Sequence, residues 1–425
     1  MSGKQLGLLL WLAFFLFYTP LACGDAGPLT LQQAYALALQ NNLEIRAVTA
    51  QRAEAQADVN LSRIRLNPGF TTDLGFISEK TYRVGGLIMP FEPPGKRRFR
   101  MQTAEHQYQQ ADYETAQKIH QILSQVRETY DSWVAGLANV AFETENEAAL
   151  RLIAESAQKR FRGKAVDELD VNQSGMLLAQ AENTVEFARH DLHITQIKLM
   201  YLLNVDRLQA PDPGHFDRLA PHEAFSLPEL MTLAESRRKD LKANEQAIEA
   251  ETARLKFFRV SRIPNITVTS GFDMVSPDDR KYIGGFFLMG QVELPIFNHQ
   301  QGNIAKSTAI KNRLLLEHDV LLQKIKQELE IAYQNLSFTE SQWKRQHDLL
   351  PLADTVDNEA LAEYLKGKST INDVLGQHAN AYFARQQALN TFIAYQEALS
   401  RIETVLTMSL TAGGDSASEP AFGDE

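Results

Sequence analysis

Apolar residues follow a helical period over most of this chain. Between Leu31 and Arg65 they recur at the spacing of one helix face, and Pro68 follows as a stop. No proline interrupts the chain between Pro94 and Pro211, so a helix from about Phe99 to Arg160 can run unbroken for roughly 90 Å. Because a helix of that length exceeds an ordinary globular domain, the sequence predicts long antiparallel coiled-coil hairpins that reverse at glycine-containing turns.

Two parts of the chain, 69–91 and 265–295, change to a period of two. In each part, apolar and polar residues alternate along a first strand, and a second strand returns after a short turn. The sequence therefore predicts amphipathic strands over the ranges 70–76, 82–91, 266–274 and 282–294. Strands of about ten residues with one apolar face are typical of a membrane barrel wall.

This pattern occurs twice along the chain. Residues 226–410 repeat residues 25–225 at offsets of 196, then 199, then 203. Matched pairs are Leu31 with Leu227, Pro68 with Pro264, Gly85 with Gly284, Phe161 with Tyr364, and Asp170 with Asp373. Each copy is predicted to be a helix, two strands and a long helical hairpin. The last residues, 411–425, are small, acidic and without a period, which predicts a disordered tail.

The first 24 residues have the order of an export signal. Lys4 precedes an apolar stretch over 6–18, and small residues follow up to Gly24. The apolar stretch is shorter than the about 20 residues that a spanning helix needs, so we expect the signal to be removed. Ala22 before Cys23 is also typical of a bacterial lipoprotein signal, so lipidation of Cys23 and plain cleavage after Gly24 both stay open.

The charge balance and the single cysteine exclude several classes of protein. The 425 residues carry 53 acidic and 43 basic side chains, a formal net charge of −10, which argues against nucleic-acid binding. A mean hydropathy of −0.28 excludes a polytopic helical membrane protein. One cysteine permits no disulfide within the chain and no cysteine-based zinc or iron–sulfur site.

The predicted strands are too few to close a membrane barrel, since the smallest bacterial barrels have about eight. Open sheet edges are not tolerated in lipid, so we expect identical chains to assemble and complete the sheet. Two other interpretations stay open from the pattern alone. One is a pair of water-soluble β-hairpins packed on helices, and the other is an exported periplasmic or cell-surface coiled-coil binding protein.

Several segments together resemble the TolC-like outer-membrane efflux proteins. They are the opening Leu29–Asn42, the positions of Pro68 and Pro264 before the strands, the segment Phe91–Arg98, and the Asp-Val pairs after the two hairpin turns. The resemblance covers the chain from Leu29 to about Leu410. The Pro-Gly-Lys-Arg-Arg run at 94–98 is similar to the heavy-metal cation branch of the family.

The resemblance implies an architecture and partners. A homotrimer would form one twelve-stranded outer-membrane β-barrel that continues into a periplasmic α-helical barrel, without a cofactor or energy source of its own. A periplasmic adaptor and an inner-membrane pump of the RND type would supply substrate and drive. The implied function is the exit duct of a tripartite efflux system in a Gram-negative bacterium, for heavy-metal cations. A drug-efflux duct or a type I secretion duct is the alternative within the family.

The resemblance also assigns roles to the hairpin turns, which would form the periplasmic tip. The implied constriction residues are Tyr364, Asp373, Asp170 and Asp167, and the implied adaptor-docking residues are Gly163, Lys164, Gly367 and Lys368. Around a three-fold axis, each acidic residue would become a ring of three charges that concentrates cations. Two departures from the family count against a salt-bridge latch: Ser369 stands where a gating arginine is known, and Lys164 stands where glycine is usual.

Alternation along the strands assigns two faces, because successive side chains point to opposite sides. Val268, Phe272 and Leu288 are predicted to face lipid. The predicted lumen residues are Thr71, Asp73, Thr267, Thr269 and Gln291.

The sequence predicts no catalytic or metal site. Gly367-Lys368-Ser369 is similar to the end of a phosphate-binding loop, but position 362 is alanine and no strand precedes it. His190 and His193 have a spacing that could hold a transition metal, but no cysteine or Glu-x-x-His pattern supports one. We interpret the two histidines as solvated or packed helix residues, and we expect no enzyme activity and no cofactor.

Overall fold

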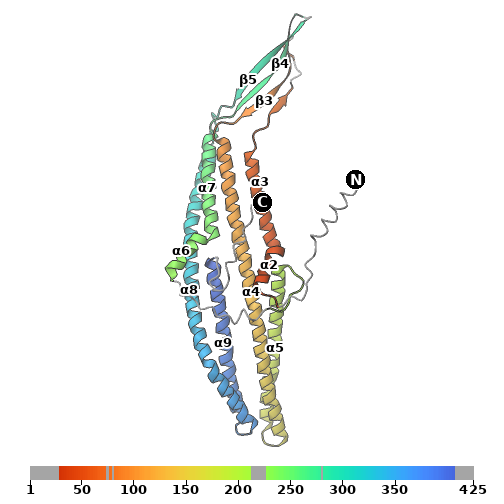
Figure 1. Ribbon diagram of the computed structural model, residues 1–425, viewed down its shortest axis with the longest axis vertical. Helices are drawn as coiled ribbons and strands as arrows, with labels where there is room; N and C mark the ends of the chain where they lie inside the picture. Colours follow the sequence, from red (N-terminus) through yellow and green to blue (C-terminus); the bar gives the residue numbers. More distant parts are fainter. Residues whose placement is uncertain (1–27, 73–75, 79–80, 212–225, 279–280, 407–425) are drawn as a thin grey trace, which may run out of the picture.

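The computed structural model describes residues 28–72, 76–78, 81–211, 226–278 and 281–406. The molecule is long and narrow, with a sheet at one end and two helical hairpins that reach the other end (Figure 1). Three features predicted above lie outside the described residues, namely the export signal with Cys23, the lumen residue Asp73, and the tail 411–425.

Two helical hairpins make up most of the length. The first is α4 (Lys96–Arg162) followed by α5 (Glu168–Leu203), and the second is α8 (Gln301–Leu365) followed by α9 (Ile371–Leu406). The 67 residues of α4 and the 65 of α8 give helices roughly 100 Å long at 1.5 Å per residue. The helix predicted from Phe99 to Arg160 is confirmed, because α4 contains it. Among the described helices, none combines the length and the apolar content that crossing a membrane requires.

Two shorter helices precede the sheet in each copy. They are α2 (Leu31–Asn41) and α3 (Leu43–Arg63) in the first copy, and α6 (Leu227–Arg237) and α7 (Lys239–Val260) in the second. The prediction of one continuous helix over 31–65 is wrong, since the helix breaks at Asn42. The Asn42 side chain accepts hydrogen bonds from the N–H groups of Glu44 and Ile45 and so caps α3. Its amide also donates to the Leu202 carbonyl oxygen at 2.7 Å, which fixes the break against α5.

The strands form one antiparallel sheet. In the described residues they are β1 (Gly69–Thr71), β2 (Phe76–Ser78), β3 (Thr81–Phe91), β4 (Ile266–Asp278) and β5 (Lys281–Val292). Their order is β1-β3-β4-β5, and β2 also pairs with β3. The first strand, predicted as one strand over 70–76, is therefore two short strands on the same partner. β3 of the first copy pairs with β4 of the second, which joins both copies in one sheet.

The helix bounds repeat with the offsets seen in the sequence. α6 begins 196 residues after α2, and α9 begins and ends 203 residues after α5. The N-terminal caps repeat as well, since Thr30 forms a capping box with Gln33 at the start of α2, and Ser226 forms one with Glu229 at the start of α6. The two copies therefore share one local design.

The largest apolar clusters lie where the short helices meet the hairpins, in the middle of the molecule. One cluster joins α2 to α4 and α5 around Tyr130 and Trp133, and another joins α6 to α8 and α9 around Leu329 and Ile402. Tyr130 is fully buried, and its hydroxyl donates to the Leu29 carbonyl oxygen at 2.8 Å. Burial of these surfaces holds each hairpin to the first short helix of its own copy.

Candidate functional site

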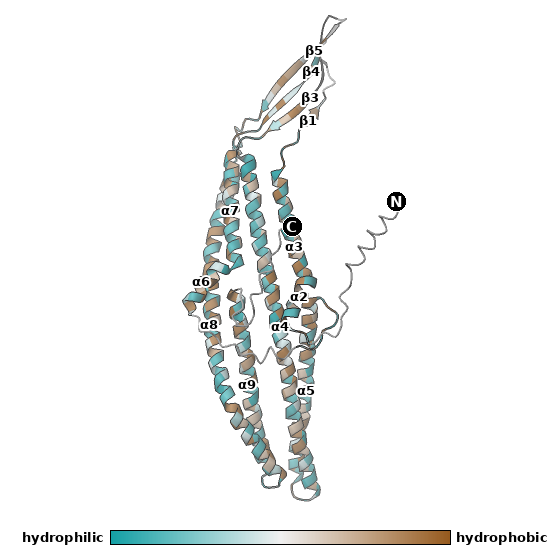
Figure 2. Cartoon of the chain, viewed as in Figure 1, coloured by the Kyte–Doolittle hydropathy of each residue, from teal (hydrophilic) through white to brown (hydrophobic). Residues whose placement is uncertain are grey.

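One face of the sheet is apolar and largely exposed in the single chain. Paired residues of neighbouring strands point to the same side, so the register places Val268, Phe272 and Leu288 on one face. Phe272 is 64% exposed and Leu288 is 69% exposed. Figure 2 shows brown apolar residues along these strands, and further exposed members of this face are Phe70, Leu87, Phe91, Ile266, Phe286 and Val292.

The predicted lumen residues lie on the opposite face. The pairing of β4 with β5 places Thr267, Thr269 and Gln291 on it, and the pairing of β1 with β3 adds Thr71. Gln291 is exposed and Thr267 is half-buried, whereas Thr269 is only 6% exposed. Of the predicted lumen residues on β4 and β5, Thr267 and Gln291 are therefore accessible, and Thr269 is packed.

The two hairpin turns have the same backbone course. Five residues separate the helices in each turn, and the left-handed residue is Lys164 in the first turn, with φ 58°, and Gly367 in the second, with φ 74°. A side chain in this conformation crowds the following carbonyl oxygen, so the lysine is strained and the glycine is not. The four docking candidates, Gly163, Lys164, Gly367 and Lys368, are all exposed at this end of the molecule.

Tyr364 is buried between the two hairpins. It is 0% exposed and belongs to an apolar cluster whose other members are Leu150, Ile153, Ala157, Ala181, Ile371, Val374 and Leu375. The Arg160 guanidinium lies over its ring, 4.9 Å from the ring centroid. Burial raises the pKa of the Tyr364 hydroxyl, and the nearby Arg160 charge partly offsets that rise. Tyr364 therefore ties α8 to the first hairpin, a role that the sequence did not predict.

The three acidic constriction candidates differ in the hydrogen bonds that their carboxylates make. The Asp373 carboxylate accepts hydrogen bonds from the Thr370 hydroxyl at 2.6 Å and from the Thr370 N–H at 3.1 Å. These bonds cap α9 and hold the pKa of Asp373 below its usual range. Asp167 is the N-cap residue of α5 and Asp170 is its third residue. Neither of these two carboxylates makes a side-chain hydrogen bond or ion pair within the described part of the chain.

Polar contacts also tie α9 to α4 and α8 beyond the turns. His378, 5% exposed, makes a 2.9 Å contact through Nδ1 with Asp357 Oδ1 and a 3.0 Å contact through Nε2 with Asn146 Oδ1. The Tyr382 hydroxyl donates to the Glu143 carboxylate at 2.9 Å. Sequence reasoning missed these residues, because a polar residue on a helix face gives no sign of which distant partner it meets.

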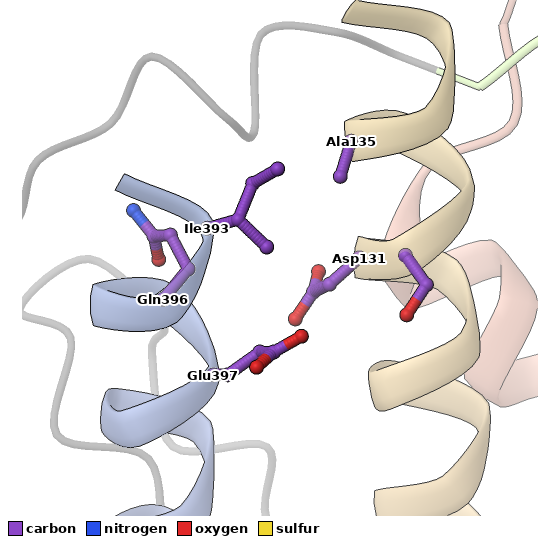
Figure 3. A pocket seen from close by; sticks show the side chains of 6 residues that line it. Asp131, Ala135, Ile393, Gln396 and Glu397 are labelled. Carbon is purple, nitrogen blue, oxygen red and sulfur yellow. The ribbon is translucent and has the colours of Figure 1, made fainter. Parts of the chain in front are cut away.

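An acidic cleft lies between α4 and α9 nearer the middle of the molecule (Figure 3). Its volume is about 200 Å³, and its lining residues are Asp131, Ser132, Ala135, Ile393, Gln396 and Glu397. Burial raises the pKa of Asp131 to about 6, with Arg127 lowering it and Glu403 raising it further. Across the described ranges, no three His, Cys, Asp or Glu side chains are grouped so as to hold a metal ion.

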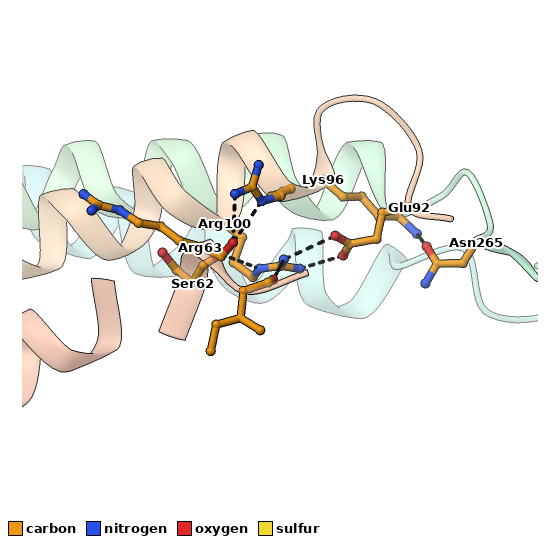
Figure 4. A network of polar contacts seen from close by, with 8 residues as sticks. Ser62, Arg63, Glu92, Lys96, Arg100 and Asn265 are labelled. Atoms are coloured by element: carbon orange, nitrogen blue, oxygen red, sulfur yellow. Dashed lines mark hydrogen bonds and ion pairs between the residues drawn. The ribbon is translucent and has the colours of Figure 1, made fainter. Parts of the chain in front are cut away.

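Arg100 closes the end of α3 where the helices meet the sheet (Figure 4). Its guanidinium donates to the carbonyl oxygens of Ser62 and Ile64, at 3.1 Å each. It also bonds both oxygens of Glu92, at 2.6 and 3.2 Å. These bonds satisfy carbonyl groups that the end of a helix leaves without a partner.

The neighbouring basic residues extend this junction. Arg97 donates to the Arg63 carbonyl oxygen at 2.8 Å, and Lys96 Nζ donates to Asn265 Oδ1 at 2.7 Å, which connects the first copy to the second. The run at 94–98, interpreted from the sequence only as a family feature, thus holds the start of α4 in place.

Comparison with known proteins shows which proteins this chain resembles. Residues 34–205 match the family model described as outer membrane efflux protein. The cobalt-zinc-cadmium resistance protein CzcC of Cupriavidus metallidurans is 25% identical over 388 residues, which cover 90% of each protein. Residues 34–205 are therefore similar to the outer membrane efflux proteins, and the chain as a whole is similar to CzcC.

Several solved structures have the same fold as this chain. A membrane protein from Pseudomonas aeruginosa is 18% identical with a TM-score of 0.75, over 88% of this chain and 92% of that one. CusC is 18% identical with a TM-score of 0.73, over 91% and 95%. The open state of the MtrE outer membrane channel of Neisseria gonorrhoeae is 17% identical with a TM-score of 0.72, over 90% and 89%. The predicted fold class, long helical hairpins with a small antiparallel sheet, is confirmed.

Proposed function

We propose that three copies of this chain form the exit duct of a tripartite efflux system. The duct connects the periplasm of a Gram-negative cell to the outside, and substrates pass through it passively. One combination carries the proposal: two long helical hairpins continue into a sheet that has an exposed apolar face and open edges. Both properties of the sheet leave surface that assembly in a membrane would cover.

Closure of the sheet sets the number of chains in the proposed barrel. β1 together with β2, and then β3, β4 and β5, supply four strand positions in a chain. Three copies that pair β5 of one chain with β1 of the next give twelve strands and leave no edge. In this assembly Val268, Phe272 and Leu288 face lipid, and Thr267 and Gln291 face the lumen.

A pair of arginine substitutions tests the two faces. Leu288→Arg places a charge on the lipid side and is expected to cost about 2–4 kcal/mol if the site lies near the membrane midplane. Gln291→Arg places the same charge on the lumen side, where water is available, and is expected to assemble. The yield of detergent-resistant oligomers from membranes measures both. Equal yields, or a lower yield for Gln291→Arg, would contradict the assignment.

The hairpin turns are the proposed docking site for a periplasmic adaptor, which connects the duct to an RND-type pump in the inner membrane. The docking residues Gly163, Lys164, Gly367 and Lys368 are exposed at the end farthest from the sheet. The constriction at this end is proposed to consist of Asp167 and Asp170, and Tyr364 and Asp373 support it by holding the second turn in place. The two carboxylates of the first turn are the more available charges, because the Asp373 carboxylate is bonded to Thr370.

The proposed substrates are divalent metal cations of the kind in the name of CzcC: cobalt, zinc and cadmium. Two observations support this choice. The relative covers 90% of this chain, and rings of Asp167 and Asp170 at the tip of a trimer would raise the local concentration of cations.

Deletion of the gene in its own host tests the function. The deletion strain is expected to retain more cobalt, zinc and cadmium, measured by elemental mass spectrometry, and to stop growing at lower concentrations of these salts. A plasmid copy carrying Gln291→Arg is expected to restore export, and one carrying Leu288→Arg is not. Unchanged metal content together with accumulation of antibiotics would replace the metal substrates with drugs. Unchanged content of both would contradict an efflux duct.

A further inference from the structure

Basic residues concentrate where the helices meet the sheet. The segments that cross this junction, 63–68, 92–100, 256–265 and 293–300, contain nine Lys and Arg residues and two Glu residues. The whole chain has a formal net charge of −10, so the junction is a basic region in an acidic protein. A local excess of one sign attracts ligands of the other.

Helix stability accounts for only part of this excess. Arg97, Arg100 and Lys96 hold α3 and Asn265 in place, and Figure 4 shows the contacts of Arg100 and Lys96. Arg63 and Arg259 lie in the last turns of α3 and α7, where a positive charge favours a helix.

Three exposed arginines neither bond to the chain nor lie in the last turn of a helix. Arg65 and Arg262 lie beyond the ends of α3 and α7, and Arg98 lies in the first turn of α4, where a positive charge disfavours a helix. Within the described residues, their side chains make no hydrogen bond or ion pair. These three guanidinium groups are therefore free to bind an external anion.

Exposed apolar side chains accompany these arginines. Leu66, Ile263, Ile296 and Phe297 are 43%, 56%, 70% and 91% exposed. They follow directly from the last row of the apolar sheet face, in which Phe91 pairs with Ile266 and Ile266 pairs with Val292. Arginines beside large apolar side chains, at the end of an apolar face, have the composition of a membrane interface.

We propose that this junction surface, made of Arg65, Arg98 and Arg262 with Leu66, Ile263, Ile296 and Phe297, binds the headgroups of anionic phospholipids in the periplasmic leaflet. The proposal rests on the proposed function, which places the apolar sheet face in the membrane. A planar guanidinium binds phosphate oxygens through two hydrogen bonds, and the apolar side chains enter the boundary between headgroups and acyl chains. Phosphatidylglycerol and cardiolipin have this headgroup chemistry.

Lipid competition in nanodiscs tests the proposal. The full-length protein is reconstituted in mixed phosphatidylglycerol and phosphatidylcholine nanodiscs, and native mass spectrometry counts the lipids that remain bound to the released assembly. The wild type is expected to retain phosphatidylglycerol preferentially. Each arginine lost is expected to lower that preference about five-fold, the equivalent of about 1 kcal/mol for a basic residue near an anionic surface. The triple variant R65Q/R98Q/R262Q should therefore lose the preference.

Two further variants separate the junction from charge in general. R189Q/R313Q/R345Q removes the same charge from exposed helix positions away from the junction and should keep the wild-type preference. R65K/R98K/R262K keeps the charge without the planar group and should retain part of it. An equal preference for phosphatidylglycerol in the wild type and R65Q/R98Q/R262Q would overturn the proposal, and so would an equal loss in R189Q/R313Q/R345Q.

Single-channel recording of the same protein in planar bilayers of phosphatidylglycerol and of phosphatidylcholine distinguishes this proposal from the proposed function. If the wild type conducts in both lipids but shows no lipid preference, the lipid site is wrong and the duct stands. If no conducting assembly forms in either lipid, the proposed duct is wrong, and the lipid proposal falls with it.

Discussion

The turn that ends the first hairpin and the turn that ends the second occupy equivalent places in the two copies, yet different contacts hold them. Tyr364 before the second turn is 0% exposed, whereas Phe161, its equivalent before the first turn, is 39% exposed. The second turn has a capping box between Thr370 and Asp373, and the first has no side-chain cap from Asp167.

Because of this difference, the polar residues of the two turns at the tip have different roles. In the second turn, the tyrosine and the aspartate serve packing and helix capping inside the chain. In the first turn, Asp167 and Asp170 have no such internal partners within the described residues, so their charges are available to a cation or to a basic partner. A pair of residues that matches between two repeats therefore need not share one role.

Removal of the buried Tyr364 ring should have the largest effect on stability. Tyr364→Ala is expected to lower the free energy of unfolding by about 3–5 kcal/mol, because it empties a site between two hairpins that can collapse only in part. Phe161→Ala should cost much less, since that side chain is partly exposed. Thermal unfolding of the purified assemblies measures both, with Tyr364→Phe as the control that keeps the ring. Similar losses for the two alanine variants would show that the turns are equivalent after all.

Substitution of the left-handed residue of each turn should have the next largest effect on stability. The effect should be destabilising in the second copy and stabilising in the first. Gly367→Ala is expected to destabilise the second turn by about 1–2 kcal/mol through backbone strain alone, because an added Cβ meets no atom within 4 Å. Lys164→Gly should relieve the same strain in the first turn and stabilise it. Denaturant unfolding compares the two variants. Destabilisation by Lys164→Gly would mean that the lysine side chain makes a contact worth more than the strain.

Removal of the two caps should have a smaller effect. Thr370→Ala is expected to cost about 1 kcal/mol, because it removes the hydroxyl that accepts from the Asp373 N–H and donates to the Asp373 carboxylate. Asp167→Ala should cost less, since no side-chain hydrogen bond to the start of α5 is lost. Hydrogen exchange of the first backbone N–H groups of each helix reports the two caps separately. Faster exchange at α5 than at α9 would reverse the comparison.

A pH dependence follows from the same cap and should be the smallest effect. Hydrogen bonds from Thr370 lower the pKa of Asp373 in the folded protein. The stabilisation is therefore fully present above the unfolded pKa of about 4 and is lost as the pH falls through the lower folded value. Between about pH 5 and pH 2, the wild type should lose more stability than Asp373→Asn, as measured by thermal unfolding. Parallel curves for the two proteins would show that the carboxylate adds nothing to the cap.

Local pattern predicted much of this fold, because helical period, strand alternation and repeat offsets are properties of neighbouring residues. The uninterrupted pattern from Phe99 to Arg160 corresponds to α4, and the return strands correspond to β3 and β5. The break at Asn42 escaped prediction, since a polar residue in a helical stretch becomes a cap only when a distant carbonyl, that of Leu202, receives its amide.

The roles of the residues at the tip and at the junction were harder to predict, because they also depend on partners that are distant in the sequence. The sequence marks Tyr364 and Asp373 as turn residues, but burial by α4 and bonding to Thr370 depend on how the hairpins pack. The arginines of 97–100 carry a family pattern in the sequence, and only the structure brings the end of α3 to them.

Single-channel recording of the purified protein in planar lipid bilayers tests the central claim, that three chains form one conducting duct, most directly. The account predicts uniform current steps from particles that contain three chains, with a preference for cations. It also predicts that D167N/D170N weakens this preference more than Asp373→Asn, because the Asp373 carboxylate is bonded within its own chain. Absence of current, or current steps from single chains, would contradict the duct, and a larger effect of Asp373→Asn would contradict the assignment of the tip charges.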